Sequence, residues 1–190
     1  MYLLHCIRHG FAQHNNLFKT CGEKSYYMDE CIDSKLLDEG IQQAVNLHNN
    51  ELNTLSNCDV VFVSPLFRTL QTAEILFTGL DTKIIVCDIL KEYPNGLQKV
   101  NCRKNKSELV KRFLKFDFSN INEEDISWNK DELETEEELD KRISYFKNKY
   151  LGPYFGKKIC IIGHNSFLSK LLLNRFEEME HCKIYEKLVM

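Results

Sequence analysis

The stretch YLLHCIRHG, from Tyr2 to Gly10, is an apolar run that ends abruptly in an arginine and a histidine. Further apolar, β-branched runs occur at DVVFVS (59–64), KIIVCDIL (83–90) and KKICIIG (157–163). Three of these four runs are nearly continuous, which is typical of strands buried on both faces of a parallel sheet. We therefore expect strands over residues 2–7, 59–64, 83–90 and 157–163.

Segments with helical patterns lie between the predicted strands and after the last one. Ser64 is an expected N-cap, with Pro65 at the first helical position. Thr135 and Glu138 form a capping-box pattern, and apolar residues after them recur every three or four positions. We expect helices over residues 38–52, 64–77, 135–151 and 166 to about 176.

Alternation of strands and helices predicts an α/β fold, as a three-layer α/β/α sandwich with a mostly parallel central sheet. The chain has 190 residues, 43% of them hydrophobic, which is enough for one sizeable core. We therefore expect a single domain over residues 1–190. The acidic stretch over residues 122–138 is expected to be a solvated loop that leads into the helix after it.

Composition and charge exclude several classes of protein. The net charge of -3 argues against a nucleic-acid binder, since affinity for phosphate backbones comes from clustered Lys and Arg. No apolar run approaches the roughly 20 residues that span a bilayer, and no signal-peptide pattern opens the sequence. The eight cysteines form no C-x-x-C pair and are expected to be reduced thiols. We expect a cytoplasmic protein with no nucleic-acid or membrane partner.

Polar residues follow each predicted strand near its carboxyl end. The first strand leads to Arg8 and His9, the second to Arg68, the third to Glu92 and the fourth to His164. Ligands of open α/β sheets bind beyond the carboxyl ends of the strands, so these five side chains are expected to share one pocket. The glycine after His9 is expected to let the backbone turn close to the ligand.

This set of side chains points to phosphoryl transfer. The guanidinium groups of two arginines match the oxygens of a tetrahedral oxyanion. A neutral His9 beside them can attack phosphorus, and a cationic His164 can offset charge on the equatorial oxygens. Glu92 can protonate the leaving oxygen. The predicted site needs no metal ion or other cofactor, and arginines repel cations.

Several motifs resemble those of the histidine phosphatase superfamily, also called the phosphoglycerate mutase-like family. They are RHG (8–10), SPLFRTLQTA (64–73), LKE (90–92) and GHNSFL (163–168), in the family's order. DSKLLDEG (33–40) is similar to the family's D-x-x-L-T-x-x-G element, with Leu37 in the place of Thr. The segment over residues 102–128 is similar to the plant and fungal phosphoglycerate mutase-like proteins.

The resemblance implies a role for each predicted site residue. His9 would become a phosphohistidine, and Glu92 would act as proton donor and then as base for water. The phosphate pocket would be formed by Arg8, Arg68 and His164. Asn15 matches a position that often touches the bound phosphate, although it is equally explained as the cap of a turn.

Other polar residues are given weaker expectations. The remaining histidines are expected to be packing or surface residues, with a substrate contact as the less favoured alternative for His14, and they are His5, His14, His48 and His181. Arg103, Lys104 and Lys106 either read a second anionic group of the substrate or belong to a solvated loop.

Three functions use such a pocket: a phosphatase, a phosphoglycerate mutase-type phosphotransferase, and a module that binds a phosphorylated ligand without turnover. The complete set of reactive residues favours catalysis over binding. Glycolytic mutases that resemble this family carry extra arginine-rich sequence after the glutamate, whereas residues 93–109 are short here. We therefore expect metal-independent hydrolysis of a small phosphorylated substrate.

Overall fold

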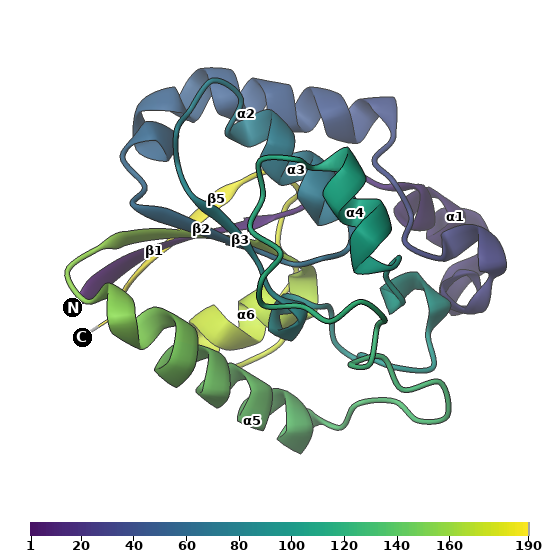
Figure 1. The fold of residues 1–190 in the computed structure, drawn as a ribbon. Helices are drawn as coiled ribbons and strands as arrows, with labels where there is room; N and C mark the ends of the chain where they lie inside the picture. Colours follow the sequence, from purple (N-terminus) through teal and green to yellow (C-terminus); the bar gives the residue numbers. More distant parts are fainter. Residues whose placement is uncertain (190) are drawn as a thin grey trace.

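A five-stranded sheet forms the centre of the computed structural model, which describes residues 1–189 (Figure 1). Its strands are β1 (Tyr2–Arg8), β2 (Val60–Val63), β3 (Ile84–Val86), β4 (Lys158–Gly163) and β5 (Ile184–Val189). The spatial order is β3-β2-β4-β1-β5, in which the first four are parallel and β5 runs antiparallel to β1. All four predicted strands are present, but the third is shorter than the predicted 83–90, because β3 ends at Val86 and Asp88–Leu90 forms a 3₁₀ turn. The fifth was not predicted because its burial varies along the strand and charged residues interrupt it.

Two layers of helices cover the two faces of the sheet (Figure 1). One face carries α2 (Asp38–Ser56), α3 (Phe67–Leu76) and α4 (Lys106–Arg112), and the other carries α5 (Glu136–Phe146) and α6 (Asn165–Leu173). Each layer buries its own apolar cluster against the sheet. The predicted three-layer α/β/α fold with a mostly parallel sheet is therefore confirmed.

Shorter elements lie near the carboxyl end of the sheet and in the connections. Helix α1 spans Gln13–Cys21 in a stretch that the sequence patterns left irregular. Short stretches of 3₁₀ or π helix lie at Gly22–Tyr27, Asp29–Cys31, Asp88–Leu90, Lys99–Asn101, Lys147–Leu151 and Gly152–Tyr154. No helix within residues 1–189 is both long and apolar enough to cross a membrane.

The start of α5 agrees with the sequence pattern, whereas the start of α3 differs from it. The Thr135 hydroxyl accepts the backbone N–H of Glu138, and the Glu138 carboxylate accepts that of Thr135, so the capping box is confirmed. The helix predicted from Ser64 is wrong in its start, because α3 begins only at Phe67. The backbone N–H of Phe67 is instead bound by the carboxylate of Asp33 at 2.6 Å.

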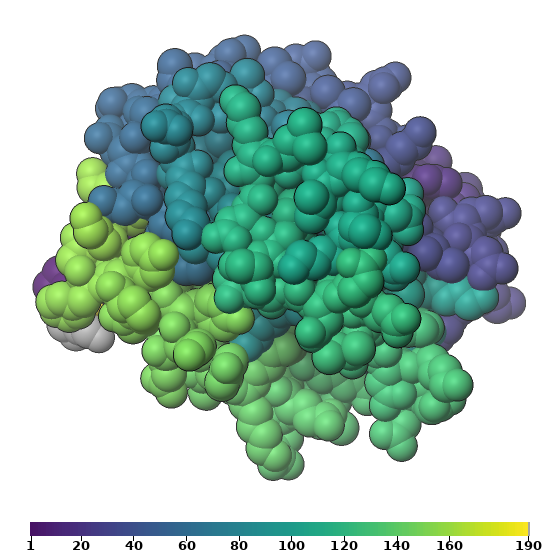
Figure 2. All heavy atoms as spheres, in the orientation of Figure 1, coloured from purple at the N-terminus to yellow at the C-terminus, as the bar shows by residue number. Residues whose placement is uncertain are grey.

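The acidic segment before α5 is a mostly exposed loop, as expected, and two ion pairs attach it to the domain. The carboxylate of Asp125 forms a buried ion pair with Lys91 at 2.6 Å, and that of Glu134 pairs with Arg142 at 2.6 Å. Figure 2 shows that the chain around residues 100–130 covers a large part of one face of the molecule. Buried charges need partners, so these pairs fix the segment against the domain.

Gly10 has a different role from the one expected. A Cβ on Gly10 would lie 2.4 Å from the carbonyl oxygen of Gly40, and a Cβ on Gly40 would lie 2.1 Å from that of Phe11. The first turn of α2 therefore packs directly on the backbone after β1. This approach, rather than contact with a ligand, requires the glycines.

Candidate active site

His9 follows directly after β1, and its side chain is oriented by the backbone. The residue is 3% exposed, and its Nδ1 lies 2.7 Å from the carbonyl oxygen of Gly10. A carbonyl oxygen only accepts hydrogen bonds, so a neutral His9 carries its proton on Nδ1. The Nε2 lone pair is therefore the one available to attack an electrophile.

Burial and nearby positive groups keep His9 neutral. Burial lowers its pKa well below the usual 6.5, and Arg68 and His164 lower that pKa further. A neutral imidazole is the nucleophilic form. The environment thus favours the reactive form of His9 at neutral pH.

Arg68 lies in the first turn of α3 and is almost completely buried. Its Nη1 donates to the carbonyl oxygen of Val100 at 3.0 Å, and its Nη2 donates to Oδ1 of Asn101 at 3.2 Å. Burial lowers the pKa of Arg68 to about 10, and Asp33 opposes that shift, so the guanidinium stays charged at neutral pH. Its Nε is buried and has no hydrogen-bond partner within residues 1–189.

Arg8 ends β1 and is half-buried. Its Nη1 donates to the carbonyl oxygen of Met179 at 2.7 Å, whereas its buried Nε has no partner in the described part of the chain. Burial lowers the pKa of Arg8, and Glu92 and Glu178 oppose the shift. Two guanidinium groups with unused donors therefore remain for a ligand.

His164 lies next to His9, with ring centroids 5.2 Å apart. Its Nε2 lies 2.8 Å from the hydroxyl of Ser64, and its buried Nδ1 has no partner among residues 1–189. Burial, followed by Arg68, lowers the pKa of His164 well below 6.5. This environment therefore favours a neutral His164, in contrast to the cationic form expected from the sequence.

Glu92 lies in the wall of the pocket, at the amino end of α6. Its carboxylate accepts the backbone N–H groups of Tyr93 at 2.8 Å, Ser166 at 3.0 Å and Phe167 at 3.1 Å. The partial positive charge at a helix N-terminus attracts a carboxylate to this position. These bonds fix the side chain beside the pocket.

Asn15 is both a cap and a pocket residue. Its Oδ1 accepts the backbone N–H of Ala12 at 2.9 Å, which confirms the turn-capping interpretation. Because Oδ1 faces a donor, Nδ2 points elsewhere, and no protein acceptor within residues 1–189 binds it. The predicted contact with phosphate stays a prediction.

These residues surround one pocket of about 750 Å³ at the carboxyl edge of the sheet. Five of the six predicted residues line it, namely Arg8, His9, Asn15, Arg68 and Glu92, and His164 packs beside His9. The donors offered are guanidinium, imidazole and amide N–H groups, which fit a tetrahedral oxyanion. Within residues 1–189, no group of three or more His, Cys, Asp and Glu residues is placed to hold a metal ion.

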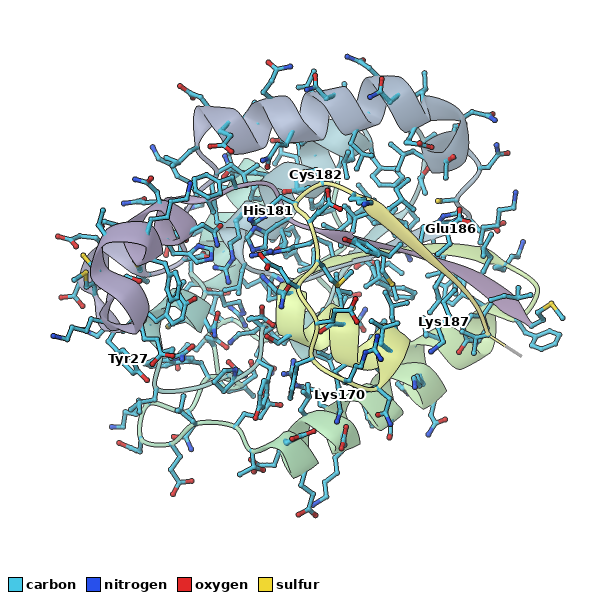
Figure 3. The ribbon with its side chains drawn as sticks, turned by 180° about the vertical axis from the view of Figure 1, so that it is seen from behind. Tyr27, Lys170, His181, Cys182, Glu186 and Lys187 are labelled. Carbon is cyan, nitrogen blue, oxygen red and sulfur yellow. The ribbon has the colours of Figure 1, made fainter. Side chains whose placement is uncertain are left out.

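Two histidines of the site were missed by sequence reasoning. The ring of His14 lines the pocket 5.5 Å from that of His9, and its Nδ1 lies 2.8 Å from the hydroxyl of Ser34. His14 belongs to the first turn of α1, a helix that was not predicted. His181 donates from Nδ1 to the carbonyl oxygen of His9 at 2.6 Å, across 172 positions of sequence, so no local signal could have found it. Figure 3 shows His181 beside Cys182, in the segment that leads into β5.

The basic residues after Glu92 do not reach the pocket. Arg103 is 3% exposed, and its guanidinium binds Asp88 at 2.8 Å and several backbone carbonyl oxygens. The Nζ of Lys106 donates to a carbonyl oxygen at 3.3 Å, and that of Lys104 lies 5.4 Å from the ring of Phe67. Their side chains therefore hold the loop rather than a substrate.

Three comparisons bear on the family of this chain. A sequence model of the histidine phosphatase superfamily (branch 1) matches residues 4–186. Phosphomutase-like protein 3 of Candida albicans is 30% identical over 182 residues, covering 87% of this chain and 57% of that protein. Phosphoglycerate mutase-like protein of Arabidopsis thaliana is 27% identical over 202 residues, covering 89% of this chain and 73% of that protein. The chain thus spans little more than half the length of the Candida protein.

Among solved structures, the ecdysone phosphate phosphatase of Bombix mori, in complex with tungstate, has a similar fold. Its TM-score with this chain is 0.68 at 18% sequence identity, and the alignment covers 98% of this chain and 88% of the phosphatase. At this identity the similarity concerns the fold.

Proposed function

The chain belongs to the histidine phosphatase superfamily, and from this we propose that it hydrolyses a phosphomonoester through a phosphohistidine on His9, without a metal ion or other cofactor. The family resemblance of the motifs, including that to plant and fungal phosphoglycerate mutase-like proteins, is confirmed. The observation that carries the proposal is the hydrogen bond from Nδ1 of His9 to the Gly10 carbonyl oxygen, which leaves Nε2 free beside two arginines.

In the first step, Nε2 of His9 attacks phosphorus and the bond from phosphorus to the ester oxygen breaks. Arg8, Arg68 and His164 bind the phosphate oxygens and offset their charge in the transition state. Glu92, in its protonated form, donates a proton to the leaving oxygen, so the alcohol departs neutral. The products are phosphohistidine and a Glu92 carboxylate.

In the second step, the Glu92 carboxylate removes a proton from water as its oxygen attacks the phosphohistidine. The P–N bond breaks, the electron pair returns to Nε2 of His9, and orthophosphate leaves. Glu92 is again protonated, so the cycle closes. Each reacting group is one that the pocket brings together.

A second candidate is transfer of the phosphate to another oxygen of the same substrate. The names of the Candida and Arabidopsis relatives favour it, since both refer to mutases. Incubation with 3-phosphoglycerate and a bisphosphoglycerate primer distinguishes the hydrolase from the transferase. Isomerisation far faster than phosphate release would establish the transferase instead of the hydrolase.

The proposal is tested by rapid-quench labelling with a ³²P-labelled aryl phosphate. We expect an acid-labile, base-stable phosphoenzyme that is absent in His9→Ala. His48→Ala is the matched control, because this histidine lies outside the pocket and donates to the Leu76 carbonyl oxygen. An acid-stable label, or full activity in His9→Ala, would exclude the phosphohistidine.

A further inference from the structure

The pocket has two chemically different ends. His9 and Arg68 are buried in the pocket, whereas the exposed residues of its lining, which form its mouth, are mainly carboxylates and aromatic rings. Resting on the function proposed above, we propose that the substrate is a monophosphate ester whose alcohol part carries a ring and no second negative charge. Sugar bisphosphates, nucleoside polyphosphates and phosphoglycerate fall outside this class.

The mouth of the pocket carries negative charge. Its lining contains the carboxylates of Glu23, Glu177 and Glu178. Glu177 pairs with Arg175 at 2.7 Å, whereas Glu23 and Glu178 form no salt bridge within residues 1–189, and Arg8 is near enough to Glu178 for that carboxylate to raise its pKa. A second anionic group of a substrate would therefore be repelled there.

Within residues 1–189, no cationic side chain other than those of the two arginines lines the pocket. In the described part of the chain, Arg8 and Arg68 are its only lysine or arginine residues. Arg8 directly precedes His9, and Arg68 is buried and lines the same pocket. Lys170 lies near the mouth, 5.6 Å from the Phe176 ring, but Glu136 and Asp140 hold its ammonium at 2.6 and 3.4 Å. The two arginines are thus the cations that the pocket offers, and one phosphate group uses both.

Aromatic rings form part of the pocket walls. Tyr93 and Phe176 stack with centroids 5.2 Å apart and an interplanar angle of 13°. Tyr26 and Tyr27 line the pocket from the segment after α1, and Figure 3 shows Tyr27 on that side of the molecule, away from Lys170 on α6. Aromatic walls of this kind bind rings by stacking and by burial of apolar surface. They fit a ring-bearing alcohol.

A matched series of three substrates tests the charge preference. O-phosphotyramine carries a remote positive charge, its N-acetyl derivative carries none, and 3-(4-phosphooxyphenyl)propanoate carries a remote negative charge. All three share nearly the same phenol leaving group, since two methylene groups separate it from the charge. We expect kcat/KM for the anionic compound to be about tenfold below that for the neutral one, with the cationic compound at least equal to it.

Variants test which side chains cause the charge and ring preferences. The double variant Glu23→Gln/Glu178→Gln is expected to remove most of the discrimination, and Glu178→Lys is expected to reverse it. Glu30→Gln is the control, because Glu30 is an exposed carboxylate of the same region that does not line the pocket. Phe176→Ala is expected to lower kcat/KM for phosphotyramine about fivefold and for O-phosphoethanolamine, which has no ring, less than twofold.

The outcomes separate this inference from the proposed function. Equal rates on the three aryl compounds, or a preference for the anionic one, would overturn the charge preference while the phosphatase function stands. Equal losses on phosphotyramine and phosphoethanolamine in Phe176→Ala would overturn the ring preference. Hydrolysis of none of them, without a phosphoenzyme, would refute the proposed function itself.

Discussion

Nε2 of His164 lies 2.8 Å from the hydroxyl of Ser64, although the two residues are 100 positions apart. Both are completely buried, so this contact fixes the imidazole next to His9. Ser64 therefore orients a site residue instead of capping α3.

Ser64→Ala is expected to lower kcat/KM about tenfold and the free energy of unfolding by about 1–3 kcal/mol, because a buried nitrogen loses its partner. Steady-state kinetics and urea denaturation measure the two effects. Ser169→Ala is the control: Ser169 is also buried, but its hydroxyl binds only the Ser166 carbonyl oxygen. Unchanged kinetics in Ser64→Ala would show that the hydroxyl does not position His164.

Asn101→Ala is expected to weaken binding of tungstate about five- to tenfold, because Arg68 loses the acceptor that orients its Nη2. Calorimetric titration of the oxyanion measures this without reference to turnover. Asn105→Ala is the control, since Asn105 is exposed and caps α4 without a side-chain bond. Equal affinities in the two variants would contradict the orienting role of Asn101.

Gly40→Ala is expected to lower the free energy of unfolding by about 3 kcal/mol or more, because its Cβ would lie 2.1 Å from backbone oxygen. Gly152→Ala is the matched control: its Cβ would meet nothing closer than 3.9 Å, so we expect little change. The denaturation midpoints of the two variants are compared. A Gly40→Ala protein as stable as Gly152→Ala would show that α2 moves away easily.

Stability is expected to fall as the pH decreases below about 6.5. Burial lowers the pKa of His9, His14 and His164 well below 6.5 in the folded protein, and that of His181 to about 4. These groups therefore take up protons on unfolding, and each adds up to about 1.4 kcal/mol per pH unit to the slope. Urea denaturation between pH 7.5 and 5 measures how the free energy of unfolding changes with pH. His14→Asn should give a shallower slope, whereas stability that rises toward pH 5 would contradict the burial of neutral histidines.

Glu92→Gln is expected to slow phosphoenzyme formation from an alkyl phosphate by about 100-fold or more, and from 4-nitrophenyl phosphate by much less. The reason is that a good leaving group departs without a proton. Rapid-quench measurement isolates this step from later hydrolysis, and Glu180→Gln, an exposed carboxylate, is the control. Equal losses on the two substrates would exclude Glu92 as the acid.

Local sequence patterns were sufficient to predict the parallel strands and the edge of the sheet at which the site forms. Buried parallel strands are continuous apolar runs, and their carboxyl ends share one edge of the sheet, so residues after each run converge. Arg8, His9, Arg68 and Glu92 indeed line one pocket, with His164 beside His9. The same reasoning missed β5 and α1, whose patterns are too polar or too short, and with α1 it missed His14.

The sequence by itself therefore determined the α/β class, the family and the set of groups offered to a phosphate, because each depends on residue types at local spacing. Only the tertiary structure decided how these groups are oriented and ionised. The tautomer of His9, the partner of His164 and the charge of the mouth depend on backbone atoms and side chains far away in sequence. Burial, which lowers the pKa of the histidines, arises only when the layers pack.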